Sequence, residues 1–162
     1  MAIRKARKND AQVILEIRGA AIKRQCVGHY SAKEMTIWAD AEVTKEFLDA
    51  VESSYFVATV AGSVVGTGMI NLGSGRVDAI FVHPKHMRTG IGRQMMSHLE
   101  KLALDAQLSQ LSLDSTLNAV AFYRSLGFVG DSVAQYASPR GFTLDCVPMI
   151  KQLPNKRSHG VC

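Results

Sequence analysis

The segment from Val82 to Met96 carries the residue types with the most direct chemical meaning. It reads V-H-P-K-H-M-R-T-G-I-G-R-Q-M-M. This pattern is typical of a strand that ends at a proline and is followed by a basic loop and then by the start of a helix. Gly90 and Gly92 lack the Cβ atoms that would keep a ligand away from the backbone. The free N–H groups and the dipole of a first helical turn favour a phosphate or pyrophosphate at such a loop. A strand-to-helix turn that needs glycine only for its own geometry is the structural alternative.

Two familiar nucleotide-binding loops do not fit this segment. A P-loop would have Lys followed by Ser or Thr after its second glycine, whereas Arg93 and Gln94 follow Gly92. A dinucleotide-binding fingerprint would need a third glycine at the position of Met95, and its strand would open a βαβ unit. The loop therefore predicts an anionic ligand without indicating an NTPase or a dinucleotide-dependent enzyme.

The elements that position this loop follow from hydrophobic periodicity and turn residues. Strands are expected at Ala2–Lys5, Tyr55–Val60, Val64–Leu72, Val77–Val82, Leu111–Leu113, Phe128–Tyr136 and Phe142–Met149. Helices are expected at Ala11–Gln25, from Ser31 through Trp38, and at Val43–Val51, Gly90–Gln107 and Asn118–Leu126. Asn9 and Asp10 are candidate N-caps of the first helix. The long helix is expected to bury a stripe made of Ile91, Met95, Leu99, Leu102 and Ala106.

The order of these elements predicts the fold class. Tyr55–Val82 forms an antiparallel meander, and the long helix then crosses over into Leu111–Leu113, which implies a parallel pair of strands. The last hairpin is expected to turn at Pro139-Arg140-Gly141. We therefore expect one α/β domain of the α+β mixed type. Its sheet would be mixed, mostly antiparallel, of roughly six to seven strands flanked by helices.

Length, charge and cysteine content narrow the classes of function. The 162 residues suit one domain, expected over residues 1–153 with a frayed tail at 154–162. With 19 Lys and Arg against 14 Asp and Glu, the net charge of +5 favours nucleic acid, anionic lipid or a phosphorylated cofactor. No apolar run approaches the roughly 20 residues of a membrane helix, and no secretory signal opens the chain. A cytoplasmic protein with reduced thiols at Cys26, Cys146 and Cys162 is expected.

A second segment, Asn118 to Phe128, reads N-A-V-A-F-Y-R-S-L-G-F. Together with the glycine loop it resembles the GCN5-related N-acetyltransferase (GNAT) family, and the resemblance covers about Ile3–Leu153. Gly90-Ile91-Gly92 matches the G-x-G of the family's first motif, whose main-chain amides grip the pyrophosphate of acetyl-CoA. The second motif is matched by Asn118, Ala121, Phe122, Tyr123, Gly127 and Phe128. One position departs, because the family usually has Gln or Arg where this chain has Met87, and Arg88 is the nearest substitute.

The resemblance implies direct transfer of an acetyl group from acetyl-CoA to a primary amine of an unidentified small molecule or peptide. The family's cofactor contacts correspond to Ile80, Phe81, Val82, Arg88, Thr89, Gly90, Ile91, Gly92, Arg93, Asn118 and Tyr123. Tyr123 matches the tyrosine that family members place near the sulfur. A phenol with an ordinary pKa near 10 stays protonated and can donate to the departing thiolate. Core packing of Tyr123 and N-capping by Asn118 are the structural alternatives.

The general base is less well specified by the sequence. Family members often place an acidic residue in the strand before the loop, where this chain has Asp78, and alternation puts Ile80 and Val82 on the same face. A carboxylate in a closed cleft can accept a proton through water. A salt-bridged or strand-end aspartate is the structural alternative for Asp78, and Asp114 is a weaker second candidate for the base. The histidines near the loop have no obvious third ligand, so no metal site is expected.

The acceptor pocket of the family usually draws on the first two helices and the final hairpin loop. The corresponding residues are His29, Tyr30, Trp38, Tyr136 and Arg140, each of which also suits packing or the surface. An amine acceptor is the expected partner, neither nucleic acid nor a membrane is expected, and a homodimer is common in the family. Two other interpretations stay open. One is a non-catalytic acyl-CoA-binding regulatory module, and the other is a nucleic-acid-binding protein suggested by the basic stretch Arg4–Lys8.

Overall fold

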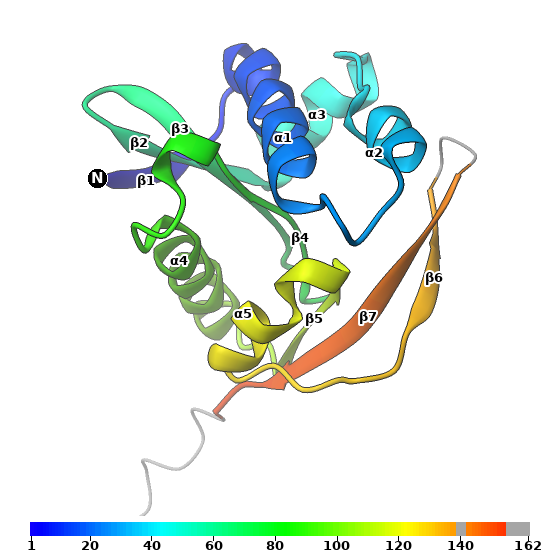
Figure 1. Cartoon of the computed structure of the whole chain (residues 1–162). Helices are drawn as coiled ribbons and strands as arrows, with labels where there is room; N and C mark the ends of the chain where they lie inside the picture. Colours follow the sequence, from blue (N-terminus) through cyan, green and yellow to red (C-terminus); the bar gives the residue numbers. More distant parts are fainter. Residues whose placement is uncertain (139–141, 155–162) are drawn as a thin grey trace, which may run out of the picture.

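The strands and helices follow the two apolar periodicities of the sequence, as the computed structural model of the protein shows for residues 1–138 and 142–154 (Figure 1). The strands are β1 (Ala2–Lys5), β2 (Tyr55–Val60), β3 (Ser63–Asn71), β4 (Arg76–Val82), β5 (Gln110–Ser115), β6 (Ala134–Ala137) and β7 (Thr143–Gln152). The α-helices are α1 (Ala11–Gln25), α2 (Ala32–Ala39), α3 (Lys45–Ser54), α4 (Ile91–Asp105) and α5 (Val120–Ser125). Three short 3-10 helices are η1 (Lys8–Asp10), η2 (Pro84–His86) and η3 (Leu117–Ala119).

The strands form one sheet in the order β1-β2-β3-β4-β5-β7-β6 within the described residues. β1 with β2, β2 with β3 and β3 with β4 are antiparallel pairs, which confirms the predicted meander, and β5 pairs antiparallel with β7. α4 connects β4 to β5, and these strands are parallel as expected. Their ladder contains one pair, Arg76 with Ser112. Most of the length of β4 and β5 is therefore not joined, and the sheet is open at its centre.

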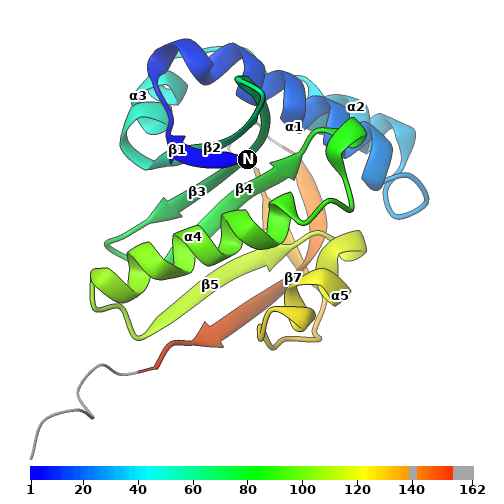
Figure 2. The same ribbon diagram turned by 90° about the vertical axis from the view of Figure 1, so that its left-hand side faces the viewer.

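The helices cover both faces of the sheet (Figures 1 and 2). α1 and α4 both pack on β3 and β4, and α4 lies on the face opposite to α1. α4 approaches the sheet closely, because a Cβ atom on Gly68 in β3 would lie only 2.7 Å from Cγ of Met95. The largest apolar cluster lies on the α4 side and includes the buried Phe128 and Leu99. The site is thus built on a rigid centre, with α1 and α2 closing one side.

Two predictions differ from the structure in ways that change strand pairing or packing. The strand expected at Phe128–Tyr136 is confined to Ala134–Ala137, preceded by a single bridge between Val129 and Ile150. The chain cannot pair continuously there, because Gly130 has φ +152 and a Cβ atom on it would lie 2.2 Å from the oxygen of Pro148. In α4, Ala106 is exposed because the helix ends at Asp105, whereas the unpredicted Met96 and Ala103 are buried. The turn expected at 139–141 and the tail expected from residue 155 onward lie outside the described residues.

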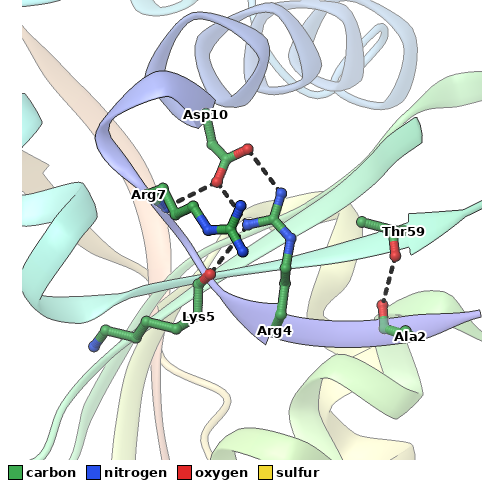
Figure 3. Close-up of polar contacts among 6 residues, drawn as sticks. All are labelled: Ala2, Arg4, Lys5, Arg7, Asp10 and Thr59. Carbon is green, nitrogen blue, oxygen red and sulfur yellow. Dashed lines mark hydrogen bonds and ion pairs between the residues drawn. The ribbon is translucent and has the colours of Figure 1, made fainter. Parts of the chain in front are cut away.

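A polar cluster joins β1 to the start of α1 (Figure 3). The Arg4 guanidinium donates two hydrogen bonds to the Asp10 carboxylate, at 2.8 and 2.9 Å, and the backbone N–H of Arg7 donates a third at 2.8 Å. Asp10 is 7% exposed, and the Arg4 hydrogen bonds lower the pKa of its carboxyl. Its carboxylate therefore closes the turn that precedes α1, rather than capping α1 itself as the sequence suggested.

Candidate active site

A β-bulge in β4 shapes the centre of the site. Met69 pairs with Asp78 and Thr67 pairs with Phe81, so two residues of β4 stand opposite one residue of β3. Ala79 occupies the bulge with φ +53, a left-handed conformation that is strained for a residue with a Cβ atom. Its N–H donates to Oδ1 of Asp78 at 2.7 Å. The bulge therefore removes part of β4 from the ladder and exposes main-chain groups beside the opening in the sheet.

The bulge also corrects the predicted face of Asp78. Strict alternation would place Asp78, Ile80 and Val82 on one face. In the structure Ile80 and Val82 pack with the apolar cluster under α4. Asp78 instead lines a cavity on the α1 side, together with Phe81, which packs in a separate cluster below α1 and α2. The extra residue at Ala79 reverses the alternation, and a single alanine gives no sequence signal of this.

The cavity next to β4 has a volume of about 690 Å³, which is within the usual range for small-molecule sites. Residues of α1, the α2–α3 connection, β4, β5, η3, α5 and the β6–β7 hairpin line it. The residues that the sequence predicted for the site and that line this cavity are Tyr30, Trp38, Asp78, Ile80, Phe81, Asn118, Tyr123 and Tyr136. The structure thus brings the Asn118–Tyr123 part of the second motif, the middle of β4 and part of the predicted acceptor region to one cavity.

The glycine loop lies at the end of β4, outside the lining of the cavity. Gly90 is the N-cap of α4 with φ +85, and the first intrahelical bond runs from Gln94 N–H to the Gly90 oxygen at 3.0 Å. The N–H groups of Ile91 to Arg93 precede that bond and are the free donors of a first helical turn. The loop residues Arg88, Thr89 and Gly90 are exposed. This geometry suits an anion that approaches from solvent.

The side chains around the loop have partners that the sequence did not predict. Nη2 of Arg93 donates to Oγ of Ser125 at 3.3 Å, which directs this arginine toward α5. Sδ of Met87, at the position that departs from the family pattern, accepts a hydrogen bond from Nε2 of Gln25 at 3.3 Å. The end of α1 therefore contacts the loop through Gln25, which also lines the cavity.

Tyr123 on α5 reaches the cavity from the core. Its ring packs edge-on against Phe122 and Phe128, with centroids 5.1 and 5.8 Å away. The residue is 9% exposed, and its hydroxyl has no hydrogen-bond partner among the described residues. Burial, and then the negative charge of Asp78, raise the pKa of this phenol above its ordinary value. Tyr123 is therefore a protonated donor with a free hydrogen at neutral pH.

Asn118 lies in η3, directly before α5. Its Oδ1 accepts a hydrogen bond from Sγ of Cys26 at 3.4 Å, and burial raises the pKa of this thiol to about 11. The thiol is thus protonated and can hold the carboxamide in place. Thr116 and Ala119 are the N-caps of η3 and α5, so Asn118 does not have the N-cap role that was its structural alternative.

The predicted acceptor residues have different environments. Tyr30 and Trp38 are buried and pack edge-on with centroids 5.5 Å apart. The Tyr30 hydroxyl donates to the main-chain oxygen of Asp145 at 2.5 Å and accepts from Leu117 N–H at 3.2 Å. Tyr30 thus links β7 to η3 in the wall of the cavity. Tyr136 is 37% exposed and lines the cavity. His29 is exposed and outside the cavity lining, and Arg140 lies outside the described residues, so an acceptor role for either stays a prediction.

Comparison with known proteins decides the family. The sequence matches the family described as "Acetyltransferase (GNAT) domain" over residues 23–153. The chain belongs to the GNAT family. It is an N-acetyltransferase, and the predicted family, fold class and enzyme class are confirmed.

Individual relatives agree with this GNAT assignment. The chain is 25% identical over 126 residues to "Uncharacterized N-acetyltransferase YafP" of Escherichia coli K12, across 78% of this chain and 79% of that protein. A GCN5-related N-acetyltransferase structure from Rhodopseudomonas palustris superposes with a TM-score of 0.85 at 28% identity, covering 94% and 95% of the two chains. A structure of YncA from Salmonella typhimurium with acetyl-CoA has the same fold, with a TM-score of 0.69, 23% identity and coverage of 100% and 99%.

Two features of this GNAT cavity were missed by sequence reasoning. Tyr55 at the start of β2 lines the cavity, and burial followed by the charge of Asp78 raises its pKa to about 12. The strand register explains this, because Tyr55 pairs with Met69 and Met69 pairs with Asp78. The second feature is an ion pair between Arg76 of β4 and Asp114 of β5. Asp114 therefore links the two strands through this ion pair, which makes it a weaker candidate for the general base than Asp78.

The described part of the GNAT domain has neither a metal-binding cluster nor a membrane-spanning helix. Residues 1–138 and 142–154 contain no group of three or more His, Cys, Asp or Glu side chains arranged to hold a metal ion. Over the same ranges, no helix is long and apolar enough to span a membrane.

Proposed function

We propose that this protein transfers an acetyl group from acetyl-CoA directly to a primary amine of a small-molecule or peptide acceptor. The observation that carries the proposal is Tyr123, a largely buried phenol that lines the cavity beside the open part of the sheet and whose hydroxyl has no hydrogen-bond partner among the described residues. Because this hydroxyl is not engaged by the described protein groups, it can donate a hydrogen bond to a group bound in the cavity. Acetyl-CoA bound to the structurally similar YncA supports the donor.

The chain has three parts that fit such a donor. The N–H groups of the first turn of α4 and the left-handed Gly90 offer an anion site for a pyrophosphate. The ladder between β4 and β5 contains only Arg76 with Ser112, so the main-chain groups of Ile80, Phe81 and Val82 on that edge face the gap. Asn118 offers its amide N–H donors, because its oxygen is occupied by Cys26. Arg88, Thr89 and Arg93 surround the loop and would add polar contacts around the pyrophosphate.

The chemistry then divides between two side chains. The acceptor amine must lose a proton to attack, since a lysine-like amine has an ordinary pKa near 10.4. Asp78 lies on the cavity face and takes that proton, directly or through water. The amine nitrogen bonds to the acyl carbon, the carbon–sulfur bond breaks, and Tyr123 donates its hydrogen to the departing thiolate. The proton that the new amide nitrogen loses returns to the phenolate through water, and Asp78 passes its proton to solvent. The raised pKa of Tyr123 suits this role, because the phenol remains protonated until it is needed.

The first test is thermal unfolding with acetyl-CoA, CoA, ATP and NAD at equal ionic strength. A ligand at about 100 times its Kd stabilises by roughly 2.7 kcal/mol, which corresponds to a shift of about 5–10 °C for a domain of this size. We expect acetyl-CoA and CoA to stabilise and NAD to have no effect. Amine-dependent release of CoA then distinguishes an acetyltransferase from a non-catalytic acyl-CoA-binding module, which would bind the donor without turnover.

A further inference from the structure

The cavity has the opposite charge to the protein as a whole. The chain has a net charge of +5, and its glycine loop contributes Lys85, Arg88 and Arg93 without any Asp or Glu between Pro84 and Ser97. Among the described residues, the cavity lining instead contains five carboxylates, those of Asp40, Glu42, Asp78, Asp114 and Asp145. The negative charge is thus gathered in the cavity, while the positive charge surrounds the loop that the donor is proposed to occupy.

The two arginines in the lining do not neutralise the cavity. Arg76 is paired with Asp114 across the strands β4 and β5. Arg18 of α1 is the other cation. Its charge acts to lower the pKa values of Tyr55 and Tyr136, whereas the charge of Asp78 raises them. At Tyr123, Asp78 is the charged group that adds to the effect of burial and raises the pKa of the phenol. Asp40 and Glu42, on the exposed connection between α2 and α3, add further carboxylates to the cavity wall.

Aromatic rings form much of the remaining wall. The cavity is lined by Tyr30, Trp38, Phe47, Tyr55, Phe81, Tyr123, Tyr136 and Phe142. Aromatic faces attract organic cations, and this attraction adds to that of nearby carboxylates. A site for an acceptor that ends in a carboxylate or phosphate would instead need unpaired cations. The proposed reaction centre is at Tyr123 and Asp78, and the lining of the same cavity also includes the carboxylates of the α2–α3 connection.

We propose that the acceptor is a small amine with a second cationic group, such as a diamine or a longer polyamine. One amine reacts at Asp78 and Tyr123, while another remains protonated and binds Asp40 and Glu42. Only the reacting ammonium is deprotonated and acetylated, losing one proton before the attack and a second as the amide forms, so the other ammonium keeps its charge throughout. This inference rests on the proposed function for its reaction, but the charge preference of the cavity can be tested by binding alone.

The experiment compares acceptors that have carbon chains of equal length and differ in the charge of the second end group. Butylamine, 1,4-diaminobutane and 4-aminobutyrate, and their eight-carbon counterparts, are each supplied with acetyl-CoA, and CoA release is measured at low and high salt. We expect kcat/KM for the diamines to exceed that for the monoamines by about fivefold or more, because each ion pair contributes modestly near a surface. The advantage should shrink at high salt, where such pairs are screened. Equal values, or a preference for the amino acids, would overturn the proposal.

Neutral variants identify the carboxylates responsible. The double variant Asp40→Asn/Glu42→Gln should raise KM for the diamines about fivefold and leave KM for the monoamines unchanged. Glu46→Gln is the matched control, because Glu46 is an exposed carboxylate on the neighbouring α3 and is outside the cavity lining. An equal rise of KM for both amine classes, or the same rise in the control, would contradict the assignment.

A binding readout separates this inference from the proposed function. Thermal unfolding is measured with each amine, with and without CoA. Stabilisation by the diamines that exceeds that by the monoamines, and that is lost in Asp40→Asn/Glu42→Gln, supports the cationic cavity even when no amine is acetylated. Stabilisation by CoA without any difference between the amine classes overturns the inference and leaves the proposed donor site standing. A lack of stabilisation by CoA and acetyl-CoA refutes the proposed function, and the amine shifts then decide the inference alone.

Discussion

A Cβ atom on Gly92 would lie 3.3 Å from Cζ of Phe122, so the first turn of α4 and the ring from α5 are already at their closest practical distance. The two motif segments of the sequence therefore touch at this glycine. Gly90 is needed for another reason. It has open space around it, with Nε2 of Gln94 the nearest atom at 4.0 Å, but its φ is +85. One glycine allows close packing, and the other allows a left-handed backbone.

Substitutions at Gly90 separate backbone strain from ligand repulsion. Gly90→Ala should lower the free energy of unfolding by about 1–2 kcal/mol, because alanine is strained at this φ. Gly90→Glu should in addition abolish binding of acetyl-CoA, because it places bulk and negative charge at the proposed pyrophosphate site. Calorimetric titration of both variants gives the affinities. An unchanged Kd in Gly90→Glu would remove the loop from the donor site.

Removing the hydroxyl of Tyr123 should affect turnover more than donor binding. We expect Tyr123→Phe to lower kcat by roughly 100-fold, the lower range for general acid catalysis, with little change in the Kd of acetyl-CoA. Since burial and Asp78 raise the pKa of Tyr123, the wild-type phenol stays protonated from pH 6 to 9. The ratio of wild-type to variant kcat should therefore be constant across that range. Equal activity of the two proteins would exclude the proton-donor role.

The sequence predicted the parts of the site that depend on local structure. Gly90 at a strand-to-helix turn and Tyr123 on a short helix were located from their motifs, and the structure places Tyr123 in the cavity. The crossover helix between parallel strands followed from general topology. These features needed only neighbours in sequence or simple connection rules.

The features that the sequence did not predict depend on non-local geometry. The bulge at Ala79 uses an alanine in a conformation that normally indicates glycine, so alternation gave the wrong face for Ile80 and Val82. Tyr55 reaches the cavity because hairpin pairing aligns it with Met69 and Asp78. That alignment could have been found by extending the predicted meander register, which places residues of neighbouring strands side by side.

Tyr30 should matter for stability through its two hydroxyl contacts. Tyr30→Phe removes the donor to the Asp145 oxygen and the acceptor for Leu117 N–H, which leaves partly buried main-chain groups without partners. We expect a loss of about 1–3 kcal/mol in the free energy of unfolding, measured by urea denaturation. Tyr136→Phe is the control, because Tyr136 is 37% exposed, and its loss should stay below about 0.5 kcal/mol. A similar loss in both variants would mean that the hydroxyl bridge contributes nothing specific.

The ion pair of Arg4 with Asp10 should make stability depend on acid pH. The Arg4 hydrogen bonds lower the pKa of Asp10 in the folded protein, so its stabilisation is complete above the ordinary aspartate pKa of about 3.9. It is lost as the pH falls from that value through the lower pKa of the folded state. Asp10→Asn should cost about 1–3 kcal/mol at pH 7 and less at pH 3, which urea denaturation at both values can measure.

Asp49→Asn serves as the matched control for Asp10→Asn. Asp49 is exposed and lies 3.8 Å from Lys8 in a surface ion pair, which is expected to contribute little. Its removal should change the free energy of unfolding by less than about 0.5 kcal/mol at either pH. If Asp10→Asn lost as much stability at pH 3 as at pH 7, the charge of Asp10 would not be the source of its effect. The link between β1 and α1 would then depend on packing around Ala6 and Ala11, which are both buried.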